Sequence, residues 1–142
     1  MAEACEAIAG FLLGQTVITS LVADRITPDK IDQSSTLPAI CYWVSAEDSE
    51  QTVQGRVGVC ATRITFEAWA ETRLGSNQLA RALKDALMPT DESFPVRGLI
   101  GEVNFLDVMI TDGSRFYPIQ RADGQDEVIY VTSQDFVFTH LE

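Results

Sequence analysis

The chain has 142 residues, 46% of them hydrophobic and 22% charged, as in a globular protein rather than a disordered one. Its formal net charge of −11 and its scattered Lys and Arg residues argue against a surface that holds a phosphate backbone. No apolar run exceeds strand length, and no basic segment precedes a long apolar stretch near the N-terminus, so we expect neither a membrane span nor a secretory signal. We expect one domain over residues 1–142, whose last two residues, Leu141 and Glu142, resemble a cloning scar.

Two helices are predicted in the N-terminal part of the chain. Residues 2–13 carry apolar side chains at the spacing of one helix face, at Cys5, Ile8, Phe11 and Leu12. A second, short helix is predicted to begin at a Thr16 cap and to direct its apolar side chains inward, those of Val17, Ile18, Leu21 and Val22. Residues 27–36 lack periodicity and are predicted to form a loop.

A hairpin of two strands is predicted next. Residues 38–46 are rich in β-branched and aromatic side chains and form the first strand, and the acidic residues 47–52 after it predict an exposed turn. Residues 56–70 form the second strand. Their alternation places apolar side chains on one face, which we expect to be the only deeply buried one, and Arg63, Thr65 and Glu67 on the other.

The second half of the chain is predicted to contain one helix and two strands. Residues 77–87 have a helical apolar stripe, with Ser76 as a candidate cap, and residues 90–98 form a linker. Residues 102–111 are apolar on both faces, so we expect a central strand. Residues 112–126 form a long connection to a last strand over 128–140. These elements predict an α+β fold with a single antiparallel or mixed four-stranded sheet, in the order α-(α)-β-β-α-β-β, and helices packed on one face.

Residues able to bind a metal or catalyse a reaction are few and scattered. Cys5, Cys41 and Cys60 lack close spacing and are expected to be free thiols in a reducing compartment, although a disulfide between the latter two remains open. The single histidine, His140, is expected to be exposed at a strand end. A zinc site from these four residues would need ligands from distant elements, so we predict none.

Other features also favour simple explanations. Two acidic groups lack the offsets of a calcium loop and are interpreted as solvated charge: Glu47, Asp48 and Glu50, and Asp123, Asp126 and Glu127. Gly58 predicts a bulge or a close backbone approach. Phe116 and Tyr117 lie between Arg115 and Arg121 and form either a small contact patch or a loop packed on its own domain. We predict no catalytic, cofactor-binding or metal-binding residues, and an enzyme would need a convergent polar pocket, for example near Glu67 or Asp107.

The order of these elements resembles the tail-completion (tail-terminator) family of long-tailed phages, prophages and gene-transfer agents. The resemblance covers nearly the whole chain and rests on weak signals in the same order: Val22-x-x-Arg25-Ile26 with Pro28 beyond it, Leu37-Pro38 before a strand, Phe66-x-x-Trp69-Ala70, a helix with Leu79, Ala80, Leu83 and Leu87, and Asp135-Phe136. It implies a hexameric ring that caps the head-proximal end of the tail tube, ends tube polymerisation and offers a surface for head joining.

The resemblance also implies partners and a location. We expect self-association, contacts with the tail tube protein and the head–tail connector protein, and no stable binding to nucleic acid or membrane. The protein would act in the host cytoplasm during assembly and then in the virion tail, where negative charge would let DNA pass. The candidate interface residues are Arg63, Thr65, Glu67, Glu47, Asp48, Glu50, Arg115, Phe116, Tyr117 and Arg121. Alternatives are a head-closure or minor tail protein, or a small α+β binding module outside phages.

Overall fold

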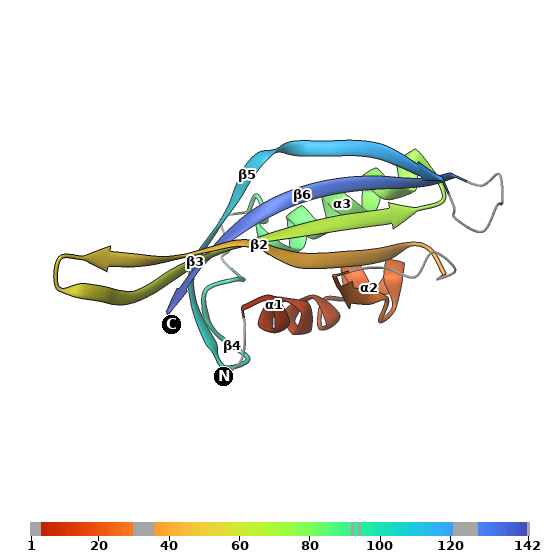
Figure 1. Ribbon diagram of the computed structural model, residues 1–142. Helices are drawn as coiled ribbons and strands as arrows, with labels where there is room; N and C mark the ends of the chain where they lie inside the picture. Colours follow the sequence, from red (N-terminus) through yellow and green to blue (C-terminus); the bar gives the residue numbers. More distant parts are fainter. Residues whose placement is uncertain (1–3, 30–35, 92, 94, 121–127, 142) are drawn as a thin grey trace.

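The computed structural model describes residues 4–29, 36–91, 93, 95–120 and 128–141. Within these residues the chain forms three helices and one six-stranded mixed sheet (Figure 1). The fold is therefore mostly β, and the expectation of a four-stranded sheet was wrong. The additional strands are β1 (Ile26–Pro28) and β4 (Gly98–Ile100), which have three residues each and are too short to show a periodic signal.

The four long strands are β2 (Ala39–Thr52), β3 (Gly55–Ala70), β5 (Val103–Gln120) and β6 (Val128–Leu141). The strand order is β1-β2-β3-β6-β5-β4, and neighbours are antiparallel except that β1 runs parallel to β2. Strands β3 and β6 thus form the centre of the sheet. The prediction that residues 102–111 form a central strand was wrong, because β5 lies next to the border and leaves Leu106 and Met109 exposed.

The acidic residues 47–52, expected to form a turn, continue β2 instead. Glu47 pairs with Thr62 and Thr52 with Gly55, so the chain turns only after Thr52. This part of the hairpin extends beyond the helices (Figure 1). Because both of its faces are exposed to solvent, its sequence lacks the alternation of apolar and polar residues that would have predicted a strand. We call residues 47–62 the hairpin arm. Gly58 has a φ of 82° and lies at an irregularity in the register of the arm, as predicted for a bulge.

The expected connection over residues 112–126 is also largely a strand. Strand β5 continues to Gln120 and pairs with β6 as far as Val128. Its register shifts between Thr111 and Arg115, and the polar residues that resembled a turn form this irregularity. The last strand, β6, agrees closely with the prediction and includes Leu141, which pairs with Val59.

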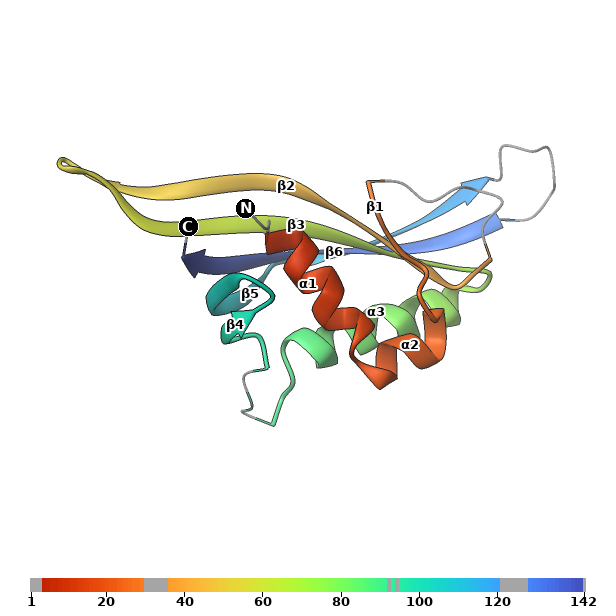
Figure 2. The same ribbon diagram turned by 90° about the horizontal axis from the view of Figure 1, so that it is seen from below.

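The three helices are α1 (Ala4–Leu13), α2 (Thr16–Val22) and α3 (Arg73–Leu87), and they cover the same face of the sheet (Figure 2). In α2, Ile18 and Val22 are buried, but Val17 and Leu21 are exposed, contrary to the prediction, because a helix of seven residues turns only one stripe inward. Among the described helices, none alone has the length and apolar character to cross a membrane. Helices α1 and α2 together meet both criteria but are bent by 84° at their junction.

Helix α3 begins earlier than predicted. Its cap is Thr72, whose hydroxyl accepts a hydrogen bond of 3.0 Å from the Gly75 amide. Ser76, the predicted cap, is buried and donates to the Ala68 carbonyl at 2.9 Å. The predicted inward stripe of α3 is confirmed at Leu79, Ala80, Leu83 and Leu87.

The main core lies between the helices and the sheet. Alternate residues of β3 are buried there as predicted, and Phe66 meets Phe136 of β6 edge to face, with ring centroids 5.7 Å apart. A second buried cluster occupies the opposite face and consists of Ala39, Cys41, Trp69, Ile129 and Val131. The expectation of only one buried face was therefore wrong. Cys41 belongs to this second cluster while Cys60 faces the helices, and among the described residues neither cysteine forms a disulfide.

Candidate functional site

The face of the sheet opposite the helices carries a charged network at its centre. Arg63 of β3 donates to the Asp135 carboxylate of β6, with Nη2 at 2.7 Å and Nε at 3.1 Å from Oδ2. The other carboxylate oxygen accepts from the Thr65 hydroxyl at 2.7 Å and from Arg115 Nη2 at 3.2 Å. Three predicted interface residues, Arg63, Thr65 and Arg115, thus converge on one carboxylate.

Asp135 is almost completely buried, whereas both arginine side chains remain partly exposed. Burial alone would raise the pKa of Asp135, but the hydrogen bonds from Thr65 and Arg63 and the charge of Arg115 outweigh it, so the pKa is lowered. The carboxylate is therefore ionised at neutral pH and holds strands β3, β5 and β6 together. It was not predicted as a site residue, although an Asp inside an otherwise apolar strand pattern was an available signal.

Glu67 lies beside this network on the same face. Its carboxylate accepts hydrogen bonds from the Tyr117 hydroxyl of β5 and, at 3.4 Å, from the Trp69 indole. Burial raises the pKa of Glu67, and the Trp69 hydrogen bond and Arg115 oppose this shift only in part. The sequence allowed either a contact patch or packing against the same domain for Phe116 and Tyr117. Tyr117 contacts its own domain, whereas Phe116 beside it is exposed.

The remaining predicted interface residues lie elsewhere. Asp48 and Glu50 are exposed on the hairpin arm, and Glu47 extends from the arm on the helix-covered side, where it pairs with Thr62. Arg121 lies outside the described residues. The structure therefore brings Arg63, Thr65, Glu67, Arg115 and Tyr117 together and separates them from the acidic residues of the arm.

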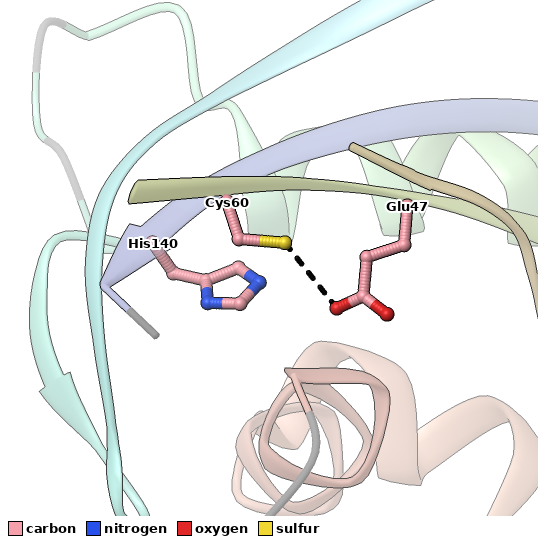
Figure 3. A group of neighbouring side chains, drawn as sticks. All are labelled: Glu47, Cys60 and His140. Carbon is pink, nitrogen blue, oxygen red and sulfur yellow. Dashed lines mark hydrogen bonds between the residues drawn. The ribbon is translucent and has the colours of Figure 1, made fainter. Parts of the chain in front are cut away.

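A second polar cluster lies where the arm joins the body of the sheet (Figure 3). Glu47 Oε1 is 3.3 Å from both Cys60 Sγ and the Thr62 hydroxyl, and that hydroxyl is 2.7 Å from His140 Nε2. His140 is buried, so the expectation that it is exposed was wrong. Its ring packs edge to face on Phe105, with centroids 5.8 Å apart.

This cluster joins residues that are far apart in the sequence. The antiparallel register pairs Cys60 with His140 and Thr62 with Glu47, so three strands each supply a side chain. These contacts depend on which strands are neighbours and on their register. The sequence did not indicate the strand order, and it predicted a turn at Glu47. A cluster of this kind was therefore not predicted.

An enzyme was expected to need a convergent polar pocket near Glu67 or Asp107, and a small pocket lies beside Asp107. Its volume is about 140 Å³, and Arg97 forms an ion pair of 3.6 Å with Asp107 at its rim. Pockets for small-molecule ligands are typically of about 300 Å³ or more. The pocket beside Asp107 is thus smaller than a typical small-molecule site.

Comparison with known proteins identifies the fold. No protein-family model matches the sequence, and no curated protein matches it significantly. Among solved structures, the chain is similar to one from the virion of a native gene transfer agent (GTA) particle, with a TM-score of 0.60 over 95% of this chain and 92% of that chain. The two sequences are 10% identical, so the likeness establishes a shared fold.

Proposed function

We propose that the protein is a structural component of a phage-like particle and acts there as the tail terminator, a ring that caps the head-proximal end of the tail tube. The observation that carries this proposal is a pair of long, open strand edges at opposite borders of the sheet. Strand β1 pairs only with residues 40–42 of β2, and β4 only with residues 103–105 of β5. Among the described residues, no strand pairs with residues 43–48 of β2 on the side away from β3, or with residues 106–119 of β5 on the side away from β6.

Open edges of this length favour pairing with another chain. The four long strands alternate in direction from β2 to β5, so β5 of one copy would meet β2 of the next copy in antiparallel orientation. Such head-to-tail contacts continue one sheet from copy to copy and close into a ring when the rotation between copies allows it. The proposed ring, which the resemblance implies is a hexamer, would thus be joined by strand pairing, the same type of contact that holds the sheet of each monomer together.

The charges at the two borders favour this arrangement over a two-fold pairing. The β2 border carries exposed acidic residues, including Asp48, which would face their own copies if two β2 edges met. The β5 border instead offers Arg115 and the exposed apolar side chains of Met109 and Phe116. Pairing of unlike borders therefore avoids like-charge repulsion and buries apolar surface.

The overall charge and the fold likeness are consistent with this role. A net charge of −11 disfavours stable contact with DNA, which a protein lining a tail channel must let pass. The similar chain comes from a phage-like particle, which supports a virion component without specifying which one. The partners proposed here are the tail tube protein and the head–tail connector protein.

The experiment combines the purified protein with its proposed partner, the tail tube protein. We expect negative-stain images to show rings of the protein at one end of each tube and tubes that stop growing once capped. Tubes that remain uncapped and continue to grow would refute the terminator role. Rings that instead bind an isolated connector and not the tube would favour a head-closure protein.

A further inference from the structure

We propose that Glu47, Cys60 and His140 form a binding site for a divalent zinc ion at the base of the hairpin arm. Their ligand atoms, a carboxylate oxygen, Sγ and a ring nitrogen, all lie within 4.8 Å of one another (Figure 3). This inference is independent of the proposed tail-terminator function.

The chemistry of the three donors selects the metal. Zinc is borderline soft and is bound by thiolate, imidazole and carboxylate at about 2.0–2.3 Å, whereas Ca²⁺ and Mg²⁺ prefer oxygen alone. Tetrahedral bonds of that length separate ligand atoms by about 3.5 Å. The Glu47–Cys60 distance of 3.3 Å is already close to this value, and rotation of the exposed Glu47 side chain can adjust its distance to His140, while all three ligand atoms lie within 4.8 Å of one another.

The orientation of His140 supports the site. Its Nδ1 lies 3.0 Å from the Leu141 carbonyl, which can only accept, so Nδ1 carries the proton and donates it. In the neutral ring Nε2 then has a lone pair, 2.7 Å from the Thr62 hydroxyl. An imidazole that donates its other N–H to a backbone carbonyl is the usual arrangement of a histidine that binds a metal.

Glu47 and His140 already share one hydrogen-bond donor, which a metal ion could replace. The Thr62 hydroxyl has one proton and lies near two acceptors, His140 Nε2 at 2.7 Å and Glu47 Oε1 at 3.3 Å. Zinc would bind the two acceptors directly in place of the Thr62 hydroxyl, which keeps its proton, and the Cys60 thiol would release its proton to solvent as it binds. Water completes the fourth position, because three protein ligands leave one open.

The consequence of binding would be a rigid arm. Glu47 lies on β2, Cys60 on β3 and His140 on β6, so one ion would tie both strands of the arm to the centre of the sheet. In the assembly, the arm would then keep a fixed direction relative to the body of each subunit.

The test uses the full chain without a histidine tag, stripped with a chelator and titrated with Zn²⁺, and with Co²⁺ as a spectroscopic probe. We expect one Zn²⁺ per chain and a thiolate-to-Co²⁺ charge-transfer band. Glu47→Gln, Cys60→Ser and His140→Gln should each weaken binding by at least about 10-fold, and Cys60→Ser should abolish the band.

Two matched controls change a residue next to the proposed site or on the opposite face of the sheet. Asp48→Asn removes the neighbouring carboxylate on the other face of β2, and Cys41→Ser removes a buried thiol from the opposite cluster. Both should leave Zn²⁺ binding and the Co²⁺ band unchanged. Far-UV circular dichroism checks for misfolding, and we expect Glu47→Gln to keep the fold because it changes an exposed side chain. A wild-type dissociation constant weaker than about 100 μM, or equal losses in controls and ligand variants, would overturn the proposal.

Discussion

Arg63 reaches diagonally across the two central strands to Asp135, which pairs with Thr65, and forms with it a hydrogen-bonded ion pair of 2.7 Å on the face without helices. Because Asp135 is buried, its replacement by Asn removes the negative charge to which two guanidinium groups donate. We expect Asp135→Asn to lower the free energy of unfolding by about 2 kcal/mol, the typical contribution of hydrogen bonds to a charged group. Urea unfolding at neutral pH measures this difference, and Asp48→Asn, an exposed carboxylate, is the control.

The same pair predicts a pH dependence. The pKa of Asp135 in the folded protein lies below its usual value of 3.8, so the folded state favours the carboxylate. The stabilising contribution is therefore complete above that usual value and is lost as pH falls through the lowered pKa. The difference in unfolding free energy between wild type and Asp135→Asn should thus be constant between pH 7 and 5 and shrink below about pH 3.8. A difference that does not change with pH would contradict the ionised state of Asp135.

The cap of α3 gives a second prediction. Thr72 accepts from the Gly75 amide at 3.0 Å, so Thr72→Ala should lower the free energy of unfolding by about 1 kcal/mol. Thr72→Ser keeps the acceptor and should be close to wild type. Thermal or chemical unfolding of the two variants decides whether this hydroxyl stabilises the helix. An equal loss in both would place the effect in the packing of the threonine methyl group instead.

Local patterns predicted the parts of the fold that depend on neighbouring residues. The alternation of β3, the stripe of α3 and the apolar run of β6 each produced an element where it was expected. Both long strand extensions were missed, because residues 47–52 are polar, residues 112–120 begin with the turn-like Asp-Gly-Ser, and neither segment shows alternation. Propensity favours turns for such residues, but pairing with the next strand outweighs it.

The sites depend on contacts that local patterns do not contain. The shared polar face of Arg63, Thr65 and Glu67 follows from alternation, and the structure confirms it. Their partner Asp135 and the approach of His140 to Cys60 follow only from the pairing of β3 with β6, across more than 70 residues of sequence. The single histidine and the three cysteines lack the close spacing typical of metal ligands, so the sequence did not predict the cluster at the base of the arm.

The third prediction concerns the reactivity of Cys41. Burial, together with the charges of Glu67 and Asp29, raises the pKa of the Cys41 thiol to about 12. The reactive thiolate is then negligible at pH 8, so Cys41 should resist alkylation by iodoacetamide in the folded protein and react once the chain is unfolded. Mass spectrometry of alkylated peptides measures this. Rapid labelling of native Cys41 would show that the second buried cluster opens readily.

The last prediction tests the open β5 border as an assembly surface. Reversing Arg63 is a poor test, because Arg63 holds buried Asp135 and its loss would disturb the monomer. Met109 and Phe116 are 59% and 56% exposed on β5, so Met109→Lys and Phe116→Lys should leave the monomer folded. Each places a charge where the next copy would bury apolar surface, which we expect to weaken self-association at least about 10-fold.

The matched control is Leu74→Lys, since Leu74 is 66% exposed on α3, away from both borders. Sedimentation velocity over a range of concentrations measures association, and thermal unfolding checks the fold. Association that falls in both β5 variants and not in the control supports pairing through this border. Equal association in all three proteins would exclude the β5 edge, and the ring would then need contacts through the arm or the helices.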